Sequence, residues 1–298
     1  MQKVLITGGT GLIGKQLSEL LESKGYEVRL LSRKKKPSSK FKTFLWNIQE
    51  GFIDKKAFSD LDFIVHLAGA GIADKKWSDK RKQVIIDSRV KSTELLLKYI
   101  RMLKTPLKAF ISSSAVGIYG SVTSEIIFTE SDNPGNDYLA QVCKLWENSV
   151  FEFEVDQIRT VAIRTGIVLS AEGGALEKMN TPVITSLGSG MQYMPWIHID
   201  DLCEIYLHAI EKPNMKGTFN GVAPEHESNK SFSKKLAFVY KKPFIPIGVP
   251  AFLLKMVFGE MATILLNGSR ISSEKIIEYD FKFKYASLNE ALRNLKNS

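Results

Sequence analysis

Cysteine is scarce in this sequence. Among 298 residues there are only two, Cys143 and Cys203, and neither has a partner nearby at the spacing of metal ligands. The sequence therefore predicts neither a disulfide framework nor a zinc site, and a reducing cytoplasm is the expected compartment. We also expect no secretion signal, because residues 1–6 run straight into a strand pattern.

A long uninterrupted apolar run is also missing. The most apolar later segment, Phe244 to Leu266, is broken by Pro246, Pro250, Lys255, Gly259 and Glu260. Such a segment is too interrupted to span a bilayer, so we expect helices packed on the core of a soluble protein with no membrane partner.

Acidic residues are outnumbered, 32 against 41 lysines and arginines, which gives a net charge of +9. This excess could attract nucleic acid, but the lysines are scattered apart from the run at 33–36, and no aromatic-basic recognition module accompanies them. The sequence therefore does not favour nucleic acid as a partner, and the phosphate of a cofactor explains the local run better.

The first half of the chain alternates apolar strands with amphipathic helical stretches. The early segments are Lys3–Thr7, Gly11–Ser23, Glu27–Leu31, Asp62–Leu67, Ser78–Met102 and Lys108–Ser112, and the later ones are Tyr138–Phe153, Arg159–Leu169, Trp196–Ile199, Asp201–Glu211 and Thr218–Asn220. Such alternation predicts an α/β fold, a Rossmann-type doubly wound parallel sheet. We assign it to residues 1–169 and 196–222. Residues 170–195 and 223–298, where short helices and loops dominate, are expected to form a smaller, mainly helical lid on the substrate side.

The strongest motif is a glycine turn that directly follows the first strand and opens the first helix. Its glycines recur with the spacing GxxGxxG, which permits a tight turn, a close approach of pyrophosphate to the backbone, and close packing of helix on strand. Free N–H groups at the helix start can then bind phosphate. The predicted contact residues are Gly8, Thr10, Gly11, Leu12, Ile13 and Gly14.

The second strand ends at Ser32 and Arg33, where an NAD-selective fold often carries an acidic residue. A guanidinium can bind a 2′-phosphate, so the sequence favours NADP(H), with NAD(H) still possible. Arg33 could instead be a solvated surface cation. Residues 66–70, His-Leu-Ala-Gly-Ala, close another strand with small residues, which suits a cofactor crossing at Leu67, Ala68 and Gly69, although such residues could also merely pack a turn.

Taken together, these features resemble the extended branch of the short-chain dehydrogenase/reductase superfamily. Within it, the chain is similar to an atypical subgroup of NAD(P)-dependent epimerase-family proteins, which has no settled substrate. The segments that carry the similarity are Trp77–Arg81, Asp87–Arg89, Asp137–Glu147, Gly188–Gly190 and Pro195–Asp201, and the match covers essentially the whole chain.

The resemblance implies further cofactor contacts. Ser32 and Arg33 would meet the 2′-phosphate, and the backbone of Gly166, Ile167 and Val168 would lie near the nicotinamide. Arg89 would face the cofactor from a position where extended relatives usually carry asparagine. It could instead tie its helix to a loop.

Superfamily catalysts commonly combine a tyrosine, a lysine four residues later and a serine from the preceding strand. Ser114 is the counterpart of the serine, unless it only caps a turn, and Tyr138 is the best placed tyrosine, unless it only packs beneath the lid. Val142 stands where the lysine should be, and Lys144, six residues after Tyr138, projects about 120° away on a helix. The predicted catalytic residues are therefore Ser114 and Tyr138.

Other polar residues favour structural roles. Asp200 or Asp201 is expected to cap a helix rather than form a catalytic dyad with His198, and Asp137 and Glu147 suit a helix start and a helix surface.

The sequence thus predicts an NADP(H)-binding oxidoreductase or epimerase-like enzyme that acts on an unidentified small molecule. A non-catalytic NADP(H)-binding sensor or scaffold is the alternative. Substrate, reaction direction and oligomeric state do not follow from the sequence.

Overall fold

An eight-stranded sheet occupies the centre of the molecule, in the order β12-β8-β6-β5-β1-β2-β3-β4. Its strands are β1 (Lys3–Thr7), β2 (Glu27–Ser32), β3 (Lys42–Asn47), β4 (Phe52–Ile53), β5 (Phe63–His66), β6 (Ala109–Ala115), β8 (Arg159–Thr165) and β12 (Gly217–Gly221). Neighbouring strands are parallel except β3 and β4, which are antiparallel. The computed structural model describes residues 1–34 and 39–297, so Lys35 and Lys36 of the basic run lie outside the described residues.

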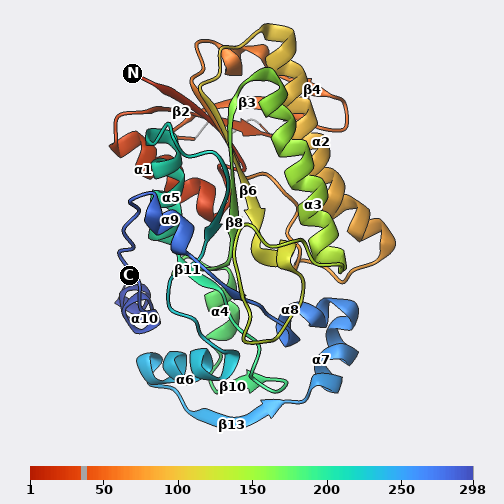
Figure 1. Cartoon of the computed structure of the whole chain (residues 1–298), viewed down its shortest axis with the longest axis vertical. Helices are drawn as coiled ribbons and strands as arrows, with labels where there is room; N and C mark the ends of the chain where they lie inside the picture. The colour runs from red at the N-terminus through yellow and green to blue at the C-terminus, as the bar shows by residue number, and fades with distance from the viewer. Residues whose placement is uncertain (35–38, 298) are drawn as a thin grey trace.

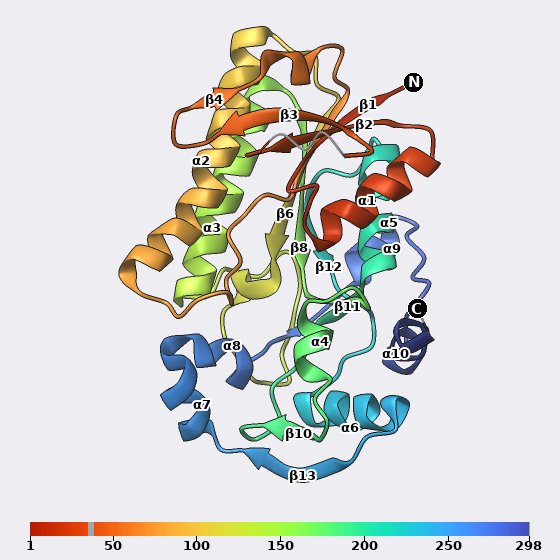
Figure 2. The same cartoon turned by 180° about the vertical axis from the view of Figure 1, so that it is seen from behind.

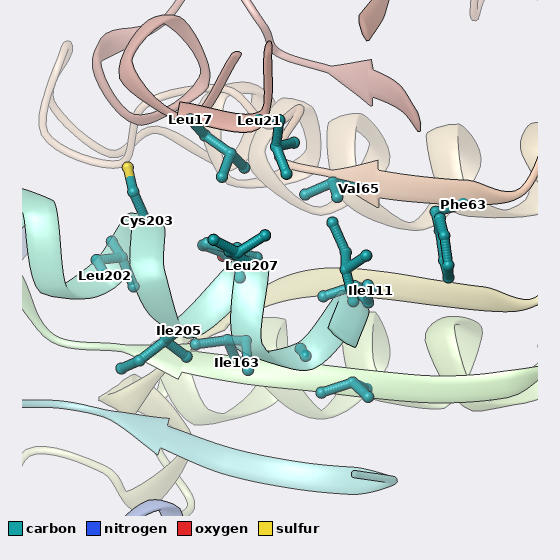
Figure 3. Packing of buried hydrophobic residues seen from close by; sticks show 14 of the residues in the cluster. Leu17, Leu21, Phe63, Val65, Ile111, Ile163, Leu202, Cys203, Ile205 and Leu207 are labelled. Carbon is teal, nitrogen blue, oxygen red and sulfur yellow. The ribbon is translucent and has the colours of Figure 1, made fainter. Parts of the chain in front are cut away.

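Helices cover both faces of this sheet (Figures 1 and 2). On one face lie α1 (Leu12–Ser23) and α5 (Ile199–Glu211), and on the other α2 (Asp79–Leu103) and α3 (Tyr138–Phe151). Figure 3 shows Leu17 and Leu21 of α1 and Leu207 of α5 packed over Val65 and Ile111 of the strands, and all five side chains are almost fully buried. Each such side chain contributes about 1.5–3 kcal/mol by leaving water. The predicted doubly wound sheet is confirmed.

The order of the strands reverses beside β1. After β1 the chain continues outward through β2 and β3, and it then returns to β5 on the other side of β1 and proceeds to β6 and β8. In open α/β sheets, ligands bind at the carboxyl ends of the strands at such a switch point. Here these ends are Thr7 and His66, which lie side by side in register.

Smaller elements make up the rest of the chain, and β10, α6, β13 and α7 lie beyond one end of the sheet (Figures 1 and 2). The elements of this region are α4 (Ala175–Met179), β10 (Ile184–Leu187), α6 (Asn229–Tyr240), β13 (Phe244–Val249), α7 (Ala251–Phe258), α8 (Thr263–Leu266), β14 (Arg270–Ile271), α9 (Glu274–Glu278) and α10 (Leu288–Asn297). Short connecting pieces are β7 (Ile127–Phe128), β9 (Ile167–Leu169), β11 (Trp196–His198) and the 3₁₀ turns η1 (Lys55–Phe58), η2 (Val116–Tyr119), η3 (Glu152–Asp156) and η4 (Gly259–Ala262). A separate apolar cluster around Trp196, Phe232 and Leu292 holds α6 and α10 together.

The segment from Phe244 to Leu266 differs from its expected form. Its first part is the strand β13, which pairs with β10, because its β-branched residues favour an extended chain and Pro250 precedes the turn into α7. In α7, Phe252 and Met256 are 68% and 71% exposed, and Leu254 is buried. The expectation of helices was therefore wrong for Phe244–Val249, whereas Ala251–Leu266 is helical in α7, η4 and α8. Within the described residues, no helix combines the length and apolar character needed to cross a bilayer.

Candidate functional site

The glycine turn between β1 and α1 lies at the switch point, and its glycines meet different neighbours. Gly8 has a left-handed backbone (φ +72°), and a Cβ atom there would lie 2.9 Å from the carbonyl carbon of Leu67. A Cβ atom on Gly14 would lie 2.3 Å from the carbonyl oxygen of Gly8, so α1 packs directly on the turn. Gly11 is exposed and precedes α1, and no described side chain caps that helix. The first N–H groups of α1 are therefore available to an anion.

The remaining predicted residues of this edge lie around the turn. Thr10 is exposed, whereas Leu12 and Ile13 are half-buried and pack against the core. At the end of β2, Ser32 is half-buried and Arg33 is exposed. These positions leave the side chain of Arg33 accessible to a ligand at the edge of the sheet.

A buried histidine ties β1, β5 and α2 together behind the glycine turn. Thr7 Oγ1 lies 2.7 Å from His66 Nδ1 and accepts hydrogen bonds from the amides of Leu67 and Ala68, each at 3.1 Å. The Thr7 hydroxyl proton must then point at Nδ1, which places the imidazole proton on Nε2, 3.0 Å from Ser92 Oγ. Burial lowers the pKa of His66 to about 3, so the ring is neutral at pH 7.

This network fixes the two loops that the cofactor is predicted to cross, and sequence reasoning assigned His66 no role. The available signal was a histidine at the end of an apolar strand, next to a threonine at the end of the neighbouring strand.

Arg89 extends from α2 to the loop that follows β5. Its Nη1 donates to the carbonyl oxygens of Ala70 and Ile85, both at 3.0 Å. A Cβ atom on Gly69 would lie 3.1 Å from Arg89 Cζ, so the glycine makes room for the guanidinium. The guanidinium also stacks over the ring of Trp146 on α3, with Cζ 5.0 Å from the ring centroid. Arg89 does tie its helix to a loop, and that loop is part of the predicted cofactor path.

Ser114, at the end of β6, is 2% exposed, and its hydroxyl donates to Glu147 Oε1 at 2.6 Å. Arg164 of β8 donates to both oxygens of the same carboxylate, from Nε to Oε1 and from Nη2 to Oε2, each at 2.9 Å. Glu147 is only 7% exposed, so the expectation of a helix-surface residue was wrong. The fork of Arg164 on the facing strand provides the counter-charge that allows a carboxylate to be buried.

The polar network continues beyond Arg164. Its Nη1 donates to Tyr119 Oη at 2.9 Å, and Tyr119 Oη donates to Asn220 Oδ1 at 2.6 Å. Burial raises the pKa of Tyr119 to about 12, so the phenol keeps its proton. Ser114 is thus one end of a buried chain of polar groups that joins β6, α3, β8 and β12.

Tyr138 is the first residue of α3 and is half-buried. Its hydroxyl donates to the carbonyl oxygen of Lys82 at 3.1 Å, and its ring packs edge-on against Trp77, with 4.9 Å between centroids. Burial raises the pKa of Tyr138, while the charge of Arg89 acts in the opposite direction. Lys144 is exposed, consistent with its expected projection away from the face of Tyr138. Just before the helix, Asp137 accepts a hydrogen bond from the amide of Ala140 at 2.9 Å, which confirms its helix-start role.

The backbone of Gly166–Val168 is largely engaged within the protein. The amide of Gly166 donates to Gly221 O at 3.1 Å and that of Ile167 to Pro195 O at 2.7 Å, while Val168 lies in β9 beside β11. A contact from the first two residues to a nicotinamide would therefore have to come from atoms other than their N–H groups.

His198 caps α5 in place of the expected aspartates. Its Nδ1 accepts a hydrogen bond from the amide of Asp200 at 3.0 Å, and its Nε2 lies 3.1 Å from Asn294 Oδ1. Asp201 instead accepts from the amide of Lys284 at 2.8 Å. The expectation that Asp200 or Asp201 caps this helix was wrong, because the imidazole of the residue just before the helix already reaches its free N–H group.

A cavity of about 550 Å³ opens beside α1, the start of α5 and α10. Four of its charged groups form two ion pairs: Lys15 Nζ lies 2.9 Å from Glu172 Oε2, and Lys284 Nζ lies 3.6 Å from Asp200 Oδ2. None of the described residues predicted to hold a dinucleotide lines this cavity. It is therefore a feature separate from the glycine turn.

Comparison with known proteins agrees with this geometry. Residues 4–221 match the NAD dependent epimerase/dehydratase family, and residues 249–295 match a domain of unknown function, DUF1731. The chain belongs to the NAD-dependent epimerase/dehydratase family. The resemblance seen in the sequence is thereby confirmed.

Similar members of the family match over nearly their full length. The epimerase family protein SH2119 of Staphylococcus haemolyticus is 34% identical over 99% of both chains. The human epimerase family protein SDR39U1 is 34% identical over 98% of this chain and 99% of its own. A crystal structure of human SDR39U1 (isoform 2) with NADPH superposes with a TM-score of 0.88 at 29% identity, over 100% of both chains. The fold of this family member is thus shared with a protein whose structure contains NADPH.

Proposed function

We propose that this chain is an NADP(H)-binding oxidoreductase or epimerase-like enzyme that acts on an unidentified small molecule. The observation that carries the proposal is the uncapped start of α1 at the switch point of the sheet, reached through a turn in which Gly8 and Gly14 leave no room for side chains. A pyrophosphate fits such a helix start because its oxygens accept hydrogen bonds from the free N–H groups. The NADPH in the human SDR39U1 structure supports the choice of cofactor.

Different residues of the chain would bind the cofactor and exchange a proton with the substrate. Bound NADP(H) exchanges a hydride at the nicotinamide ring. The glycine turn would hold the pyrophosphate, and Arg33 the 2′-phosphate. Ser114 and Tyr138 would orient the substrate oxygen and exchange a proton with it, beneath a lid formed by residues 170–195 and 223–298.

Arg33 provides the sharpest test, because NADPH and NADH differ only in the 2′-phosphate. A charge-assisted hydrogen bond contributes about 1.5–3 kcal/mol, which corresponds to roughly 10- to 100-fold in affinity. Isothermal titration should show that the wild type binds NADPH more tightly than NADH, and that Arg33→Ala loses NADPH affinity by this factor while NADH binding changes little.

Lys34→Ala is the matched control, since it removes one positive charge from the neighbouring position. It should weaken NADPH binding less than Arg33→Ala does. Equal wild-type affinities for the two cofactors, or equal losses in the two variants, would refute the proposed selectivity.

A non-catalytic NADP(H)-binding sensor is the second candidate, and two contacts favour it. The hydroxyl of Tyr138 is donated to a backbone oxygen, and that of Ser114 to Glu147. Screening the NADPH- and NADP⁺-loaded protein against carbonyl compounds and alcohols separates the candidates. An enzyme turns over one of them with a loss of turnover in Tyr138→Phe, whereas a sensor turns over none.

A further inference from the structure

Helix α3 lacks a cation at the place where the chemistry of Tyr138 calls for one. Val142 stands four residues after Tyr138 and is 3% exposed, and Trp146 stands four residues further on. Residues spaced by four form one stripe on an α-helix. A lysine at 142 would place its charge within this stripe, between the tyrosine and the tryptophan.

Arg89 comes from α2 and contacts this stripe at Trp146. Its guanidinium stacks on Trp146, with 5.0 Å from Cζ to the ring centroid. Its charge also interacts electrostatically with Tyr138 and with Cys143, the residue after Val142. The guanidinium thus lies against α3 at Trp146, one helical turn after Val142.

The same guanidinium reaches the predicted cofactor path. Its Cζ lies 3.1 Å from where a Cβ atom on Gly69 would be, and Nη1 donates to Ala70 O. Both of its hydrogen bonds to described residues leave from Nη1. An arginine has five donors, so Nε and Nη2 retain donors for a ligand.

We propose that Arg89 is a positioning residue that supplies from α2 the cation missing from α3, binding the ribose of NADP(H) and assisting proton exchange at Tyr138. This inference rests on the function proposed above. It assigns two tasks to one guanidinium: holding the ribose and lowering the pKa of the phenol. A guanidinium suits both, because it is charged at all physiological pH values and can donate to the cofactor while its field acts on the phenol.

The pKa of Tyr138 can be measured without any substrate, and it shows whether the charge of Arg89 acts on the phenol. Three charged side chains act on the pKa of this phenol, Arg89 and Arg81 from α2 and Glu260 from η4. A fourth, Lys82 of α2, has its Nζ 5.0 Å from the centroid of the Tyr138 ring. The arginines lower the pKa of Tyr138, whereas burial and Glu260 raise it. Removing the charge of Arg89 should therefore raise this pKa further.

The first experiment measures the phenolate absorbance of the cofactor-free protein after stopped-flow jumps to alkaline pH. Subtracting Tyr138→Phe isolates this residue among nine tyrosines. The midpoint should move to higher pH in Arg89→Gln, which keeps a donor for Ala70 O but has no charge, and should return toward the wild-type value in Arg89→Lys. Lys98→Met, which removes an exposed cation from the same helix, should leave it unchanged.

The second experiment measures NADPH affinity by titration. Arg89→Gln should bind about tenfold more weakly, the loss expected for one charge-assisted hydrogen bond. Adding Val142→Lys to Arg89→Gln restores the usual tyrosine–lysine spacing, and it should recover both the affinity and the Tyr138 midpoint. A residue that only ties a helix to a loop would not be rescued in this way.

The outcomes separate this inference from the proposed function. If the wild type binds NADPH and Arg89→Gln changes neither affinity nor midpoint, or if Val142→Lys rescues neither, the role of Arg89 is overturned and NADP(H) binding stands. If the wild type binds no dinucleotide, both fall.

Discussion

The neutral state of His66 makes an acid-sensitive fold a direct prediction. The ring is fully buried among β1, β5 and α2, where Nδ1 accepts from Thr7 and Nε2–H donates to Ser92. Protonation would place a second proton on Nδ1, against the Thr7 hydroxyl, and a charge in a buried site. Acid should therefore loosen the two loops that form the predicted cofactor site.

The size of the effect follows from the two pKa values of His66. The value is about 3 in the folded protein and 6.5 for an ordinary histidine, so between these values the unfolded chain binds more protons. The free energy of unfolding therefore falls as the pH drops through 6.5 towards 3. At about 1.4 kcal/mol per pH unit, His66 alone should remove about 2 kcal/mol between neutral pH and pH 5.

Urea unfolding at about pH 7.5 and about pH 5 measures this loss. Other groups also titrate over this range. The quantity to compare is therefore the drop in the free energy of unfolding between the two pH values, measured in the wild type and in His66→Gln. We expect the variant to be less stable at neutral pH but about 2 kcal/mol less sensitive to acid. His208→Gln, which removes a half-buried histidine from α5, should keep the full acid sensitivity. Equal losses in the wild type and His66→Gln would refute the reasoning.

Three further results are expected. Gly14→Ala would place a Cβ atom 2.3 Å from the carbonyl oxygen of Gly8. Thermal unfolding should therefore show that the free energy of unfolding falls by about 1–3 kcal/mol, and an unchanged melting temperature would contradict the close packing. Glu147→Gln leaves Arg164 buried without its counter-charge, so chemical unfolding should reveal a loss of about 3–5 kcal/mol, which a merely surface-exposed glutamate would not produce. Burial raises the pKa of Cys143 to about 12, so alkylation of the native protein, followed by mass spectrometry, should proceed only as fast as the chain opens; rapid labelling would disprove this.

Local patterns predicted the centre of the fold well. The strand Lys3–Thr7 has the expected bounds, and the helix expected from Ser78 begins one residue later because the Ser78 side chain caps it. The strand β3, second from one edge of the sheet, was missed. Its buried residues, Phe44 and Trp46, alternate with half-buried ones, a weaker signal than the continuous apolar runs of strands buried on both faces.

Contacts between distant residues explain what the sequence could not predict about the site. Glu147 looks like an exposed helix residue until the fold places Arg164 of β8 across from it. His66 is distant in sequence from Thr7 and Ser92, and its tautomer follows only from their hydroxyl groups. Motif spacing describes one element at a time, whereas a buried polar group depends on what the neighbouring element places opposite it.

Val142 illustrates the same point for catalysis. From spacing alone, an apolar residue four positions after Tyr138 indicates a degenerate site, because motif spacing considers only residues of the same helix. Proton exchange at a phenol, however, depends on the distance to a positive charge and on the polarity between them, not on which helix carries that charge. Arg89 comes from α2, is stacked on Trp146 and acts on Tyr138. Under the role proposed for Arg89, the cation that Val142 does not supply on α3 would come from α2, so residues 89 and 142 would have to be tested as a pair.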